Sequence, residues 1–473
     1  MRVNTGTTSI TLRNIEVKNN QLHLVRVHGT DVLIDNAKIH RGISRTVNSP
    51  APQPGIVSGD EFFRDAHGIE ASEAKGLTIN NTYIGYVSGD CIQSGRSVWR
   101  DLIVENSHFE IKPLEESILG LQPGSWFAED IYDTKTPDNG QGGAAFNKGV
   151  TFRNNILNGT RYSRILHGAV LNLKEGVEDI LVEGNRVFDN RMTFRLRQPT
   201  TGYIFRNNFI YGSETVFRFE GPVNDVEILN NTFYNNEIVV REIDAGATGS
   251  IISKNIFANG LHETTLRAPY ITWEHNLFHE VSSPQGTKRV EEDPLFTDAE
   301  NNDFTLQQAS PALALGMGAR LWQEPFFTVW FAGSNAPVIE GQMLELSVNV
   351  INFGGVADIQ SIEFKNNEDQ IISSYENLSL ESGKSLILDF TWDIAKIAGE
   401  EFEVFVRSKN DVYKLASEIL VTSLQGINEF PMEITLGQSF PNPFQLYTKI
   451  GFGLPKKDEV LLEIYNMDGK FVG

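Results

Sequence analysis

Residues 182–236, VEGNRVFDNRMTFRLRQPTTGYIFRNNFIYGSETVFRFEGPVNDVEILNNTFYNN, repeat one short phrase three times. The phrase is an apolar residue, a polar stretch centred on asparagine, and a second apolar residue. Asn185, Asn208 and Asn231 stand 23 residues apart. The phrase continues in both directions, with asparagines that we place in one register: Asn14, Asn36, Asn81, Asn106, Asn155, Asn185, Asn208, Asn231, Asn255 and Asn276. This sustained repeat decides the fold class.

A unit of about 23 residues holds two or three short strands, shows no helical pattern and cannot bury its apolar side alone. Such units stack, and their strands pair in parallel about 4.8 Å apart. Asparagine tolerates the left-handed backbone of a tight bend, and stacked asparagines can form hydrogen bonds along the column. The leucine spacing of leucine-rich repeats and the signature of WD propellers are absent. The sequence therefore predicts an all-β chain that begins with a right-handed parallel β-helix over residues 1–318.

The end of the repeat and the region after it have their own textures. Residues 291–318, EEDPLFTDAENNDFTLQQASPALALGMG, resemble the closing segment of many parallel β-helix proteins. Residues 319–425 alternate strand-like runs with polar turns, which predicts a seven-stranded, immunoglobulin-like β-sandwich. No motif in this region carries chemistry, so a role as a spacer or as a carbohydrate contact is the simplest expectation.

The last segment, 432–473, resembles the C-terminal sorting domain of the type IX secretion system of Bacteroidota. The matching residues are Asn442-Pro443-Phe444, Thr448, Ile450, Phe452, Leu454-Pro455, Val460, Ile464-Tyr465-Asn466 and Gly469-Lys470. The resemblance implies that the type IX machinery exports the chain across the outer membrane, to be secreted or held at the cell surface. The usual final strands do not follow Gly473, and the N-terminus begins inside a strand-like pattern. We therefore expect both ends to be truncated.

The composition of the chain limits the classes of ligand and partner to be expected. The formal net charge of -21 argues against nucleic acid as a ligand, because neutralising phosphates needs clustered Lys and Arg. Cys91 is the single cysteine, so no internal disulfide forms. There is no apolar run long enough for a transmembrane helix. We expect a monomer.

One strand per coil can be aligned by its apolar centre, which predicts the side chains that point outward. The inward residues are Ile69, Ile92, Tyr132, Leu171, Phe194, Phe217 and Val240. The outward residues next to them in the chain are Glu70, Gln93, Asp133, Asn172, Arg195, Arg218 and Arg241. Two positions further on lies a second outward column, Ser72, Gly95, Lys135, Lys174, Arg197 and Glu220.

The upper part of this surface is basic in an acidic chain. Arg195, Arg218 and Arg241 stack with like charge, and such a column repels itself unless an anion neutralises it. Glu220 and Glu242 supply part of the neutralisation, and a bound polyanion would supply the rest. The alternative is a solvated ladder whose long side chains cover apolar surface.

The lower part is acidic. Asp90, Glu129, Asp130 and Asp133 converge where loops meet strands, and Asp130 is expected to stack on Asp90 and His67. Several carboxylates suit Ca²⁺, which takes six to eight oxygen ligands. The alternative is that these carboxylates cap turns and hold no metal.

The β-helix part resembles the polysaccharide lyases of pectate-lyase-like fold, over roughly residues 1–318. Glu129-Asp130-x-x-Asp133 is similar to a calcium cluster of pectate lyases. Asp130 followed by Lys135 is similar to alginate and chondroitin lyases, although Ala128 stands where that group carries an acid. The resemblance implies β-elimination of a uronate in an acidic polysaccharide, with Ca²⁺ held by the four carboxylates.

In such an elimination a base removes the C5 proton beside a carboxylate, and a cation stabilises the developing charge. Lys135 or Lys174 is the expected base, since a lysine among other cations has a lowered pKa. The residues expected to bind substrate are Arg195, Arg197, Arg218, Arg241, Asn172 and His67, with the arginines gripping carboxylates bidentately.

Two rival functions stay open. Glycoside hydrolases of this fold use paired carboxylates, and Asp90 with Asp130 would form such a pair. A non-catalytic carbohydrate binder or adhesin is equally compatible with the fold, because fold alone does not give function.

Overall fold

A computed structural model describes most of the repeat region and part of the chain after it. The described residues are 1–45, 63–135 and 147–319, without 96, 119, 175, 198–199, 222, 243–247, 262 and 265–270. Beyond them come the seven strands between 327 and 417, with the residues next to some of them, and the short strands β40 (Thr435–Leu436) and β41 (Phe452–Gly453).

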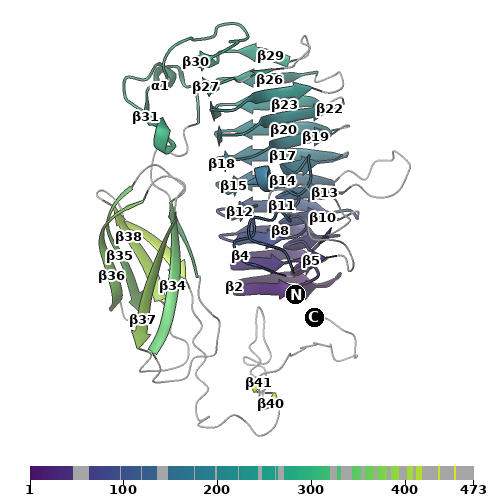
Figure 1. Cartoon of the computed structure of the whole chain (residues 1–473), viewed down its shortest axis with the longest axis vertical. Helices are drawn as coiled ribbons and strands as arrows, with labels where there is room; N and C mark the ends of the chain where they lie inside the picture. Colours follow the sequence, from purple (N-terminus) through teal and green to yellow (C-terminus); the bar gives the residue numbers. More distant parts are fainter. Residues whose placement is uncertain are drawn as a thin grey trace.

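The repeat folds as a parallel β-helix, which appears in Figure 1 as a column of stacked coils. Each coil adds one strand to a ten-stranded parallel sheet, which carries the candidate site. Its strands are β1 (Arg2–Val3), β3 (Val25–Val27), β7 (Ile69–Ala71), β10 (Ile92–Ser94), β13 (Tyr132–Thr134), β16 (Ala169–Leu173), β19 (Met192–Arg197), β22 (Thr215–Glu220), β25 (Ile238–Glu242) and β28 (Glu263–Thr264).

An 18-stranded sheet forms the remaining walls of the coils. Its strands are β2 (Thr8–Asn20), β4 (Thr30–Gly42), β8 (Lys75–Asn80), β9 (Tyr83–Val87), β11 (Arg100–Glu105), β12 (His108–Glu110), β14 (Asn147–Arg153), β15 (Ile156–Asn158), β17 (Val177–Glu183), β18 (Arg186–Phe188), β20 (Thr200–Arg206), β21 (Phe209–Tyr211), β23 (Val223–Leu229), β24 (Thr232–Tyr234), β26 (Ser250–Ser253), β27 (Ile256–Gly260), β29 (Ile271–Glu274) and β30 (Leu277–Val281). β5 (Ser44–Arg45) and β6 (Phe63–Arg64) pair antiparallel in a separate two-stranded sheet.

The strand register inferred from the repeat is confirmed. Ile69 pairs with Ile92, Ile92 with Tyr132, and Tyr132 with Leu171. The pairing continues through Phe194, Phe217 and Val240. All these side chains are buried in one continuous core that runs along the column. The residue after each of them therefore faces outward, as the alternation of a strand requires.

The asparagine column exists, but its register differs from the expected one. Asn155, Asn185, Asn208, Asn231, Asn255 and Asn276 are fully buried, and each of the last five accepts a hydrogen bond from the backbone N–H of the asparagine before it. Ser107, one position after Asn106, is the residue that joins this ladder, because its backbone N–H donates to Asn155 Oδ1. Asn14, Asn36, Asn81 and Asn106 hold the left-handed backbone instead. The expected single column is thus two adjacent ones.

The segment after the last coil folds back against the side of the column. It contains β31 (Phe296–Asp298), η2 (Ala299–Asn301), β32 (Asp303–Leu306) and α1 (Pro311–Leu315). Phe304 is buried against Phe209 and Tyr211 of the coils. A one-turn 3-10 helix, η1 (Thr160–Tyr162), lies between β15 and β16.

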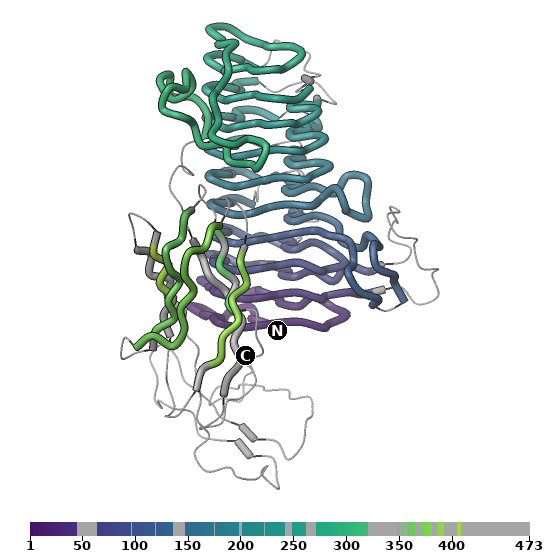
Figure 2. The backbone as a smooth tube through the Cα atoms, turned by 60° about the vertical axis from the view of Figure 1, so that its left-hand side comes forward, coloured from purple at the N-terminus to yellow at the C-terminus, as the bar shows by residue number. Residues whose placement is uncertain are grey.

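The strands after residue 326 form two antiparallel sheets, as expected for a β-sandwich. One sheet is β33 (Phe327–Phe331), β34 (Met343–Asn352) and β37 (Ser385–Asp393). The other is β36 (Ile371–Leu380), β35 (Ala357–Asn366), β38 (Phe402–Ser408) and β39 (Val412–Ser417). They enclose a separate core that includes Val348, Ile362 and Val404. Figure 2 shows this unit beside the N-terminal half of the β-helix, where β33 contacts β4.

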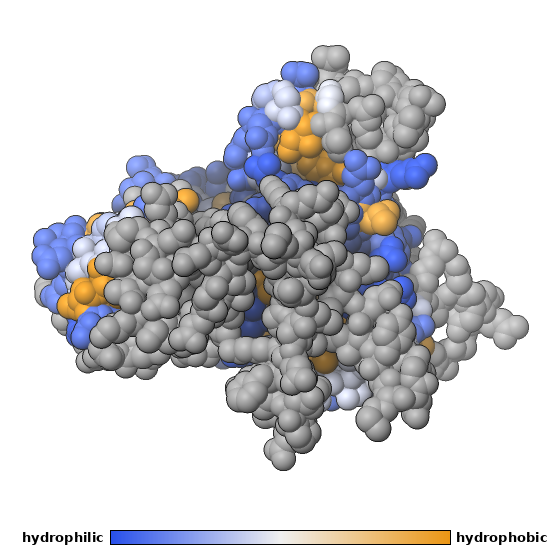
Figure 3. Space-filling view, turned by 90° about the horizontal axis from the view of Figure 1, so that it is seen from below, coloured by the Kyte–Doolittle hydropathy of each residue, from blue (hydrophilic) through white to orange (hydrophobic). Residues whose placement is uncertain are grey.

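The sorting-domain resemblance falls almost wholly outside the described residues, since only β40 and β41 of that segment are described. Seen from below in Figure 3, the described surface is mostly hydrophilic with separate hydrophobic patches. No helix among the described residues is long and apolar enough to cross a membrane.

Candidate functional site

The outward column of the ten-stranded sheet grades from acidic to basic, as the sequence predicted. Glu70, Gln93, Asp133, Asn172, Arg195, Arg218 and Arg241 occupy successive rungs. Neighbouring strands of a sheet are about 4.8 Å apart, so the column presents its groups at regular intervals along the axis. The column also extends downward, because Arg26 pairs with Glu70 across the strands β3 and β7.

A ladder of side-chain acceptors stands at the entry to this sheet. The backbone N–H of His67 donates to His23 Nδ1 at 3.2 Å, and that of Asp90 donates to His67 Nδ1 at 2.9 Å. The N–H of Asp130 donates to Asp90 Oδ1 at 3.1 Å, and that of Ala169 donates to Asp130 Oδ1 at 2.5 Å. Both Asp90 and Asp130 therefore cap the next coil with one oxygen.

His67 is one of the acceptors in this ladder. Its side chain is buried, its ring stacks on that of His23 with centroids 4.6 Å apart, and its Nδ1 accepts the Asp90 N–H. Burial, with the neighbouring His23, lowers the pKa of His67 well below its usual value. Its position in the ladder supports the stacking of Asp130 and Asp90 on His67, and its substrate-binding role stays a prediction.

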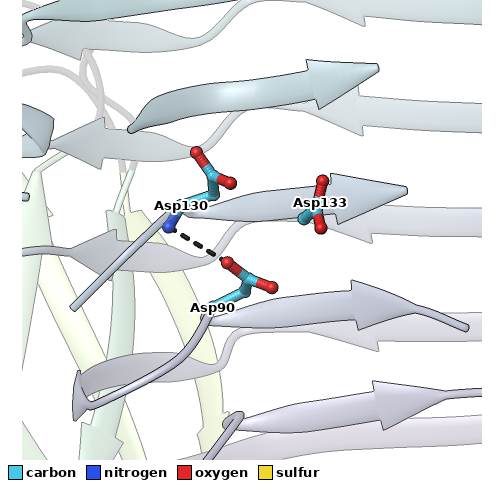
Figure 4. Close-up of side chains that lie close together, drawn as sticks. All are labelled: Asp90, Asp130 and Asp133. Atoms are coloured by element: carbon cyan, nitrogen blue, oxygen red, sulfur yellow. Dashed lines mark hydrogen bonds between the residues drawn. The ribbon is translucent and has the colours of Figure 1, made fainter. Parts of the chain in front are cut away.

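Asp90, Asp130 and Asp133 form a compact cluster, drawn in Figure 4. Their side chains are 0%, 2% and 1% exposed, and one oxygen of each lies within 4.8 Å of the others. The second oxygen of Asp90 accepts from Gln93 Nε2 at 2.9 Å, and that of Asp130 accepts from Asn172 Nδ2 at 3.1 Å. The three carboxylates expected to converge thus do converge.

The cluster is electrostatically strained. Burial, and then the Asp133 and Asp130 carboxylates, raise the pKa of Asp90 well above its usual value. Burial and Asp133 raise the pKa of Asp130 to about 7, although hydrogen bonds from Ala169 and Asn172 oppose the rise. Lys135 and Lys174 relieve part of this repulsion through Asp133, and a bound cation or a shared proton would relieve the rest.

Both candidate lysines bind the same carboxylate. Lys174 Nζ lies 2.8 and 2.9 Å from the two oxygens of Asp133, and Lys135 Nζ lies 2.5 Å from Asp133 Oδ2. Burial acts to lower the pKa of Lys135, but the Asp133 carboxylate outweighs it and raises that pKa above the ordinary value. The expectation of a lowered pKa was therefore wrong for Lys135, because an acid rather than another cation dominates its surroundings.

Glu129 is directed away from the cluster. Its carboxylate binds the guanidinium of the buried Arg164, which also donates to Asp65 Oδ1 at 3.1 Å. Glu129 is accordingly absent from the group of converging ligand atoms, which corrects its placement among the calcium ligands. Arg164 was missed because it lies between strands at no position of the repeat.

The arginines carry their own counter-charge. Glu220 accepts two hydrogen bonds from Arg195, both at 3.0 Å, and lies 2.6 Å from Arg218 Nε and 3.3 Å from Arg197 Nε. The bidentate grip that Arg195 was expected to offer a substrate is thus made with Glu220. The expected partial neutralisation by Glu220 is confirmed, whereas the side chain of Glu242 lies outside the described residues. Arg241 is exposed at the top of the column.

A second missed residue, His167, stands over the basic rungs. Its Nδ1 lies 3.3 Å from Arg218 Nη1, and the imidazole is exposed. The loop that carries it is held close to the sheet at Gly168, where a Cβ would come within 2.7 Å of the Glu129 carbonyl oxygen. No repeat signal marks His167, since it belongs to the connection before β16.

The cluster has the donor set that calcium prefers. Asp90, Asp130 and Asp133 supply hard carboxylate oxygens. The Oδ1 atom of Asn172 is buried and has no hydrogen-bond partner among the described residues, although its Nδ2 binds Asp130. An unpartnered buried oxygen beside three carboxylates is what a cation ligand looks like before the cation binds. The residues present therefore fit Ca²⁺.

Comparison with known proteins gives little beyond the architecture. No family model and no curated protein sequence matches the chain. Among solved structures, the tailspike protein gp49 of Acinetobacter baumannii bacteriophage Fri1, a capsular polysaccharide depolymerase, is similar at 10% identity with a TM-score of 0.38, covering 89% of this chain and 66% of that one. The Dettilon tailspike protein is similar at 12% identity with a TM-score of 0.28, covering 88% and 65%. The chain thus spans about two thirds of these proteins, and at such scores the fold rests on the strand pairing itself.

Proposed function

We propose that this chain is an extracellular lyase that cleaves an acidic, uronate-containing polysaccharide by β-elimination. One observation carries the proposal: Asp133 binds both lysines on the coils just below the arginine rungs. Acidic, lysine and arginine groups thus succeed one another on one face. A uronate chain laid along the column would meet a carboxylate-rich centre and a cationic strip in succession.

Asp90, Asp130, Asp133 and Asn172 are the residues that would hold Ca²⁺. When bound, the ion would neutralise a substrate carboxylate and make the C5 proton more acidic. The ladder hydrogen bonds fix one oxygen of Asp90 and one of Asp130, so these carboxylates are oriented before any ligand arrives.

Lys174 is the better-placed base. It stands two residues after Asn172, whose neighbours on the adjoining strands are Asp133 and Arg195, so it lies between the acidic centre and the arginines. Lys135 shares the coil of Asp133 and has a raised pKa, which keeps its proton on the ammonium. Lys135 is thus suited to stabilise charge or to donate a proton. To act as the base, Lys174 must first leave Asp133 and release its ammonium proton to solvent, after which its amine can take the C5 proton.

The basic rungs would position the polymer. Arg218 and Arg241 lie one and two rungs above Arg195, and Arg197 flanks them across Glu220. A carboxylate approaching this strip competes with Glu220, the anion that three guanidinium groups share. The strip therefore binds a polyanion without leaving its like charges unbalanced in the free protein.

The test is turnover on pectate, alginate, chondroitin and heparin. A lyase leaves an unsaturated uronide, seen as a rise in ultraviolet absorbance, and EDTA should abolish that rise. New reducing ends without the absorbance rise would contradict β-elimination. Binding of all four polymers without turnover would leave only the alternative of a carbohydrate-binding surface protein or adhesin.

One observation favours hydrolysis as the second candidate. The pKa of Asp130, raised to about 7, is that of a carboxyl able to act as a general acid near neutrality, with Asp90 as its partner. One oxygen of each carboxyl lies within 4.8 Å of one oxygen of the other, so the two are close enough to act as a pair. Under this alternative, EDTA would leave activity intact.

Export remains part of the proposal through the C-terminal resemblance. If the type IX machinery reads residues 432–473, then fusing this segment to a reporter in a type IX-competent host should bring the reporter outside the cell. Replacing Asn442-Pro443-Phe444 by alanines should retain it inside. Secretion that is unchanged by the replacement would contradict this assignment.

A further inference from the structure

In the hydrogen bond between His167 and Arg218, the donor and the acceptor can be assigned. A guanidinium has five N–H donors and no acceptor, so the hydrogen bond over 3.3 Å can only run from Arg218 Nη1 to a lone pair on His167 Nδ1. This requires that Nδ1 carry no proton and that the imidazole be neutral. A proton on Nδ1 would replace the bond by two facing cations.

The surroundings of the imidazole on the sheet are charged. The groups that face it are Arg218 and Glu220 on β22, Arg195 on β19 and Arg241 on β25. Burial, then Arg218 and Arg195, lower the pKa of His167; Glu220 opposes this and Arg241 adds to it. Arg164, in the same loop, is committed to Glu129 and Asp65. The free protein thus holds His167 neutral beside a strip of cations.

An anion reverses this balance. A carboxylate or sulfate oxygen that enters beside Arg218 accepts the guanidinium N–H, releases Nδ1, and supplies a negative partner for a protonated ring. We propose that His167 and Arg218 form a proton-coupled anion subsite, at which an acidic group of the polysaccharide binds together with one proton on the imidazole.

The coupling fixes the sign of the pH dependence. His167 has a lower pKa in the free protein than in the complex, so binding takes up a proton and tightens as the pH falls through the interval between the two values. Each unit of difference between them gives about a tenfold gain in affinity. Above the higher pKa the affinity no longer depends on this group. The subsite deepens the proposed function, on which it rests for the acidic polysaccharide as ligand.

The experiment is calorimetric titration of the full chain in EDTA with oligogalacturonate, which carries only carboxylates, and with heparin oligosaccharides, which also carry sulfates. Titrations at several pH values between 5 and 8, in two buffers of different ionisation enthalpy, give the protons taken up. We expect uptake toward the acidic end of this range for the native chain. His167→Gln should bind as the native chain does at pH 8 and lose the uptake and the tightening.

The matched control is His275→Gln, which changes a partly buried histidine after β29 on the 18-stranded sheet and should leave the uptake unchanged. A second measurement needs no ligand, because NMR gives the pKa of His167 directly. Arg218→Met should raise this pKa, since the substitution removes the nearest cation. An unmoved pKa would overturn the proposal. Failure of both oligosaccharides to bind, or proton uptake that persists in His167→Gln, would also overturn it.

Turnover is scored separately. A chain that shows His167-dependent proton uptake but cleaves nothing would sink the lyase proposal and leave the subsite standing. If the native chain cleaves uronates but His167→Gln binds with the same pH dependence as the native chain, the lyase proposal stands and the subsite is contradicted.

Discussion

Two ladders of polar side chains run up the β-helix, and they differ in charge. One consists of six buried asparagines from Asn155 to Asn276. Each lies at the bend between two successive strands of the 18-stranded sheet, as Asn185 does between β17 and β18. The other consists of His23, His67, Asp90 and Asp130 at the entry to the ten-stranded sheet. In both, a side-chain atom on one coil accepts a hydrogen bond from the backbone N–H of a neighbouring coil.

The asparagine ladder uses all of its polar atoms. Asn208 Oδ1 accepts from the backbone and the side chain of Asn185, while its Nδ2 donates to Asn231 Oδ1 and to the Val182 carbonyl. Nothing is left over for a ligand. Asp90 and Asp130 also cap one N–H each, but their second oxygens accept from the side chains of Gln93 and Asn172 and not from the backbone of a coil.

The use of amides in one ladder and carboxylates in the other distinguishes side chains that the fold requires from side chains that it does not. An amide satisfies the corner without burying charge, and the fold uses it six times. Carboxylates in an equivalent role bring the cost of buried, mutually repelling charges. Asp90 and Asp130, with Asp133 beside them, are therefore the carboxylates that stacking alone does not explain, and the cation or shared proton proposed above would account for them.

The largest expected effect is on turnover. Lys174→Ala should lower the rate of uronate cleavage by about 10²–10⁴-fold, the usual contribution of a general base. Lys135→Ala, assayed separately, should lower it less. Lys148→Ala is the control, since Lys148 lies on β14 of the other sheet and only approaches Asp179 at 3.9 Å. Full activity in both site variants would remove the lysines from the mechanism.

Asp130→Asn tests the ladder directly, because Asn Oδ1 can still cap Ala169. Without calcium, a folded pKa of about 7 means that the native chain binds more protons than the unfolded chain between about pH 4 and 7. Native stability therefore falls as the pH rises through that window, by about 1.4 kcal/mol per pKa unit of the shift. Asp130→Asn should escape this fall and melt higher at pH 8.

Calcium should reverse the order of the melting temperatures of the native chain and Asp130→Asn at pH 8. Saturating Ca²⁺ should raise the melting temperature of the native chain at pH 8, because a ligand that binds only the folded state stabilises it. Asp130→Asn should gain much less. A melting temperature of Asp130→Asn below that of the native chain at pH 8 without calcium would mean that the carboxylate itself supports the fold.

Asn208→Ala tests the asparagine ladder and leaves the carboxylate cluster intact. It leaves the backbone N–H of Asn185 and the Val182 carbonyl buried without their partners, at roughly 1–3 kcal/mol for each unsatisfied group. Denaturant unfolding should show this loss, with calcium binding by the remaining folded protein unchanged. A neutral Asn208→Ala would mean that the neighbouring rungs relax to satisfy one another.

The sequence predicted the ladders unequally well. The repeat and the apolar centres gave the outward column from Glu70 to Arg241 correctly, because a strand alternates strictly and parallel coils repeat the same alternation. The one-residue difference at Asn106 and Asn155 arose because both the bend and the ladder favour asparagine. Two adjacent columns of one residue type cannot be separated by pattern alone.

The site was harder to predict than the scaffold. Convergence of Asp90, Asp130 and Asp133 came from the register, whereas the partners of Glu129 and Arg195 did not. Arg164 and His167 come from the connection before β16, and a connection between strands carries no periodicity from which to place it. The pKa of Lys135 was misjudged for a related reason: pattern gave its neighbours but not which of them its ammonium touches.

The smallest expected effect concerns the upper end of the column. Glu220→Gln removes the carboxylate shared by Arg195, Arg197 and Arg218, while the amide oxygen can still accept a hydrogen bond. Stability should fall by about 1 kcal/mol or less, the usual worth of partly exposed ion pairs. Affinity for heparin should rise about fivefold and depend more steeply on salt, because the arginines lose an internal competitor. Glu183→Gln, which releases Arg206 on the other sheet, is the control of similar exposure. If Glu220→Gln weakened binding instead, Glu220 would be a positioning group that orients the guanidinium groups of Arg195, Arg197 and Arg218.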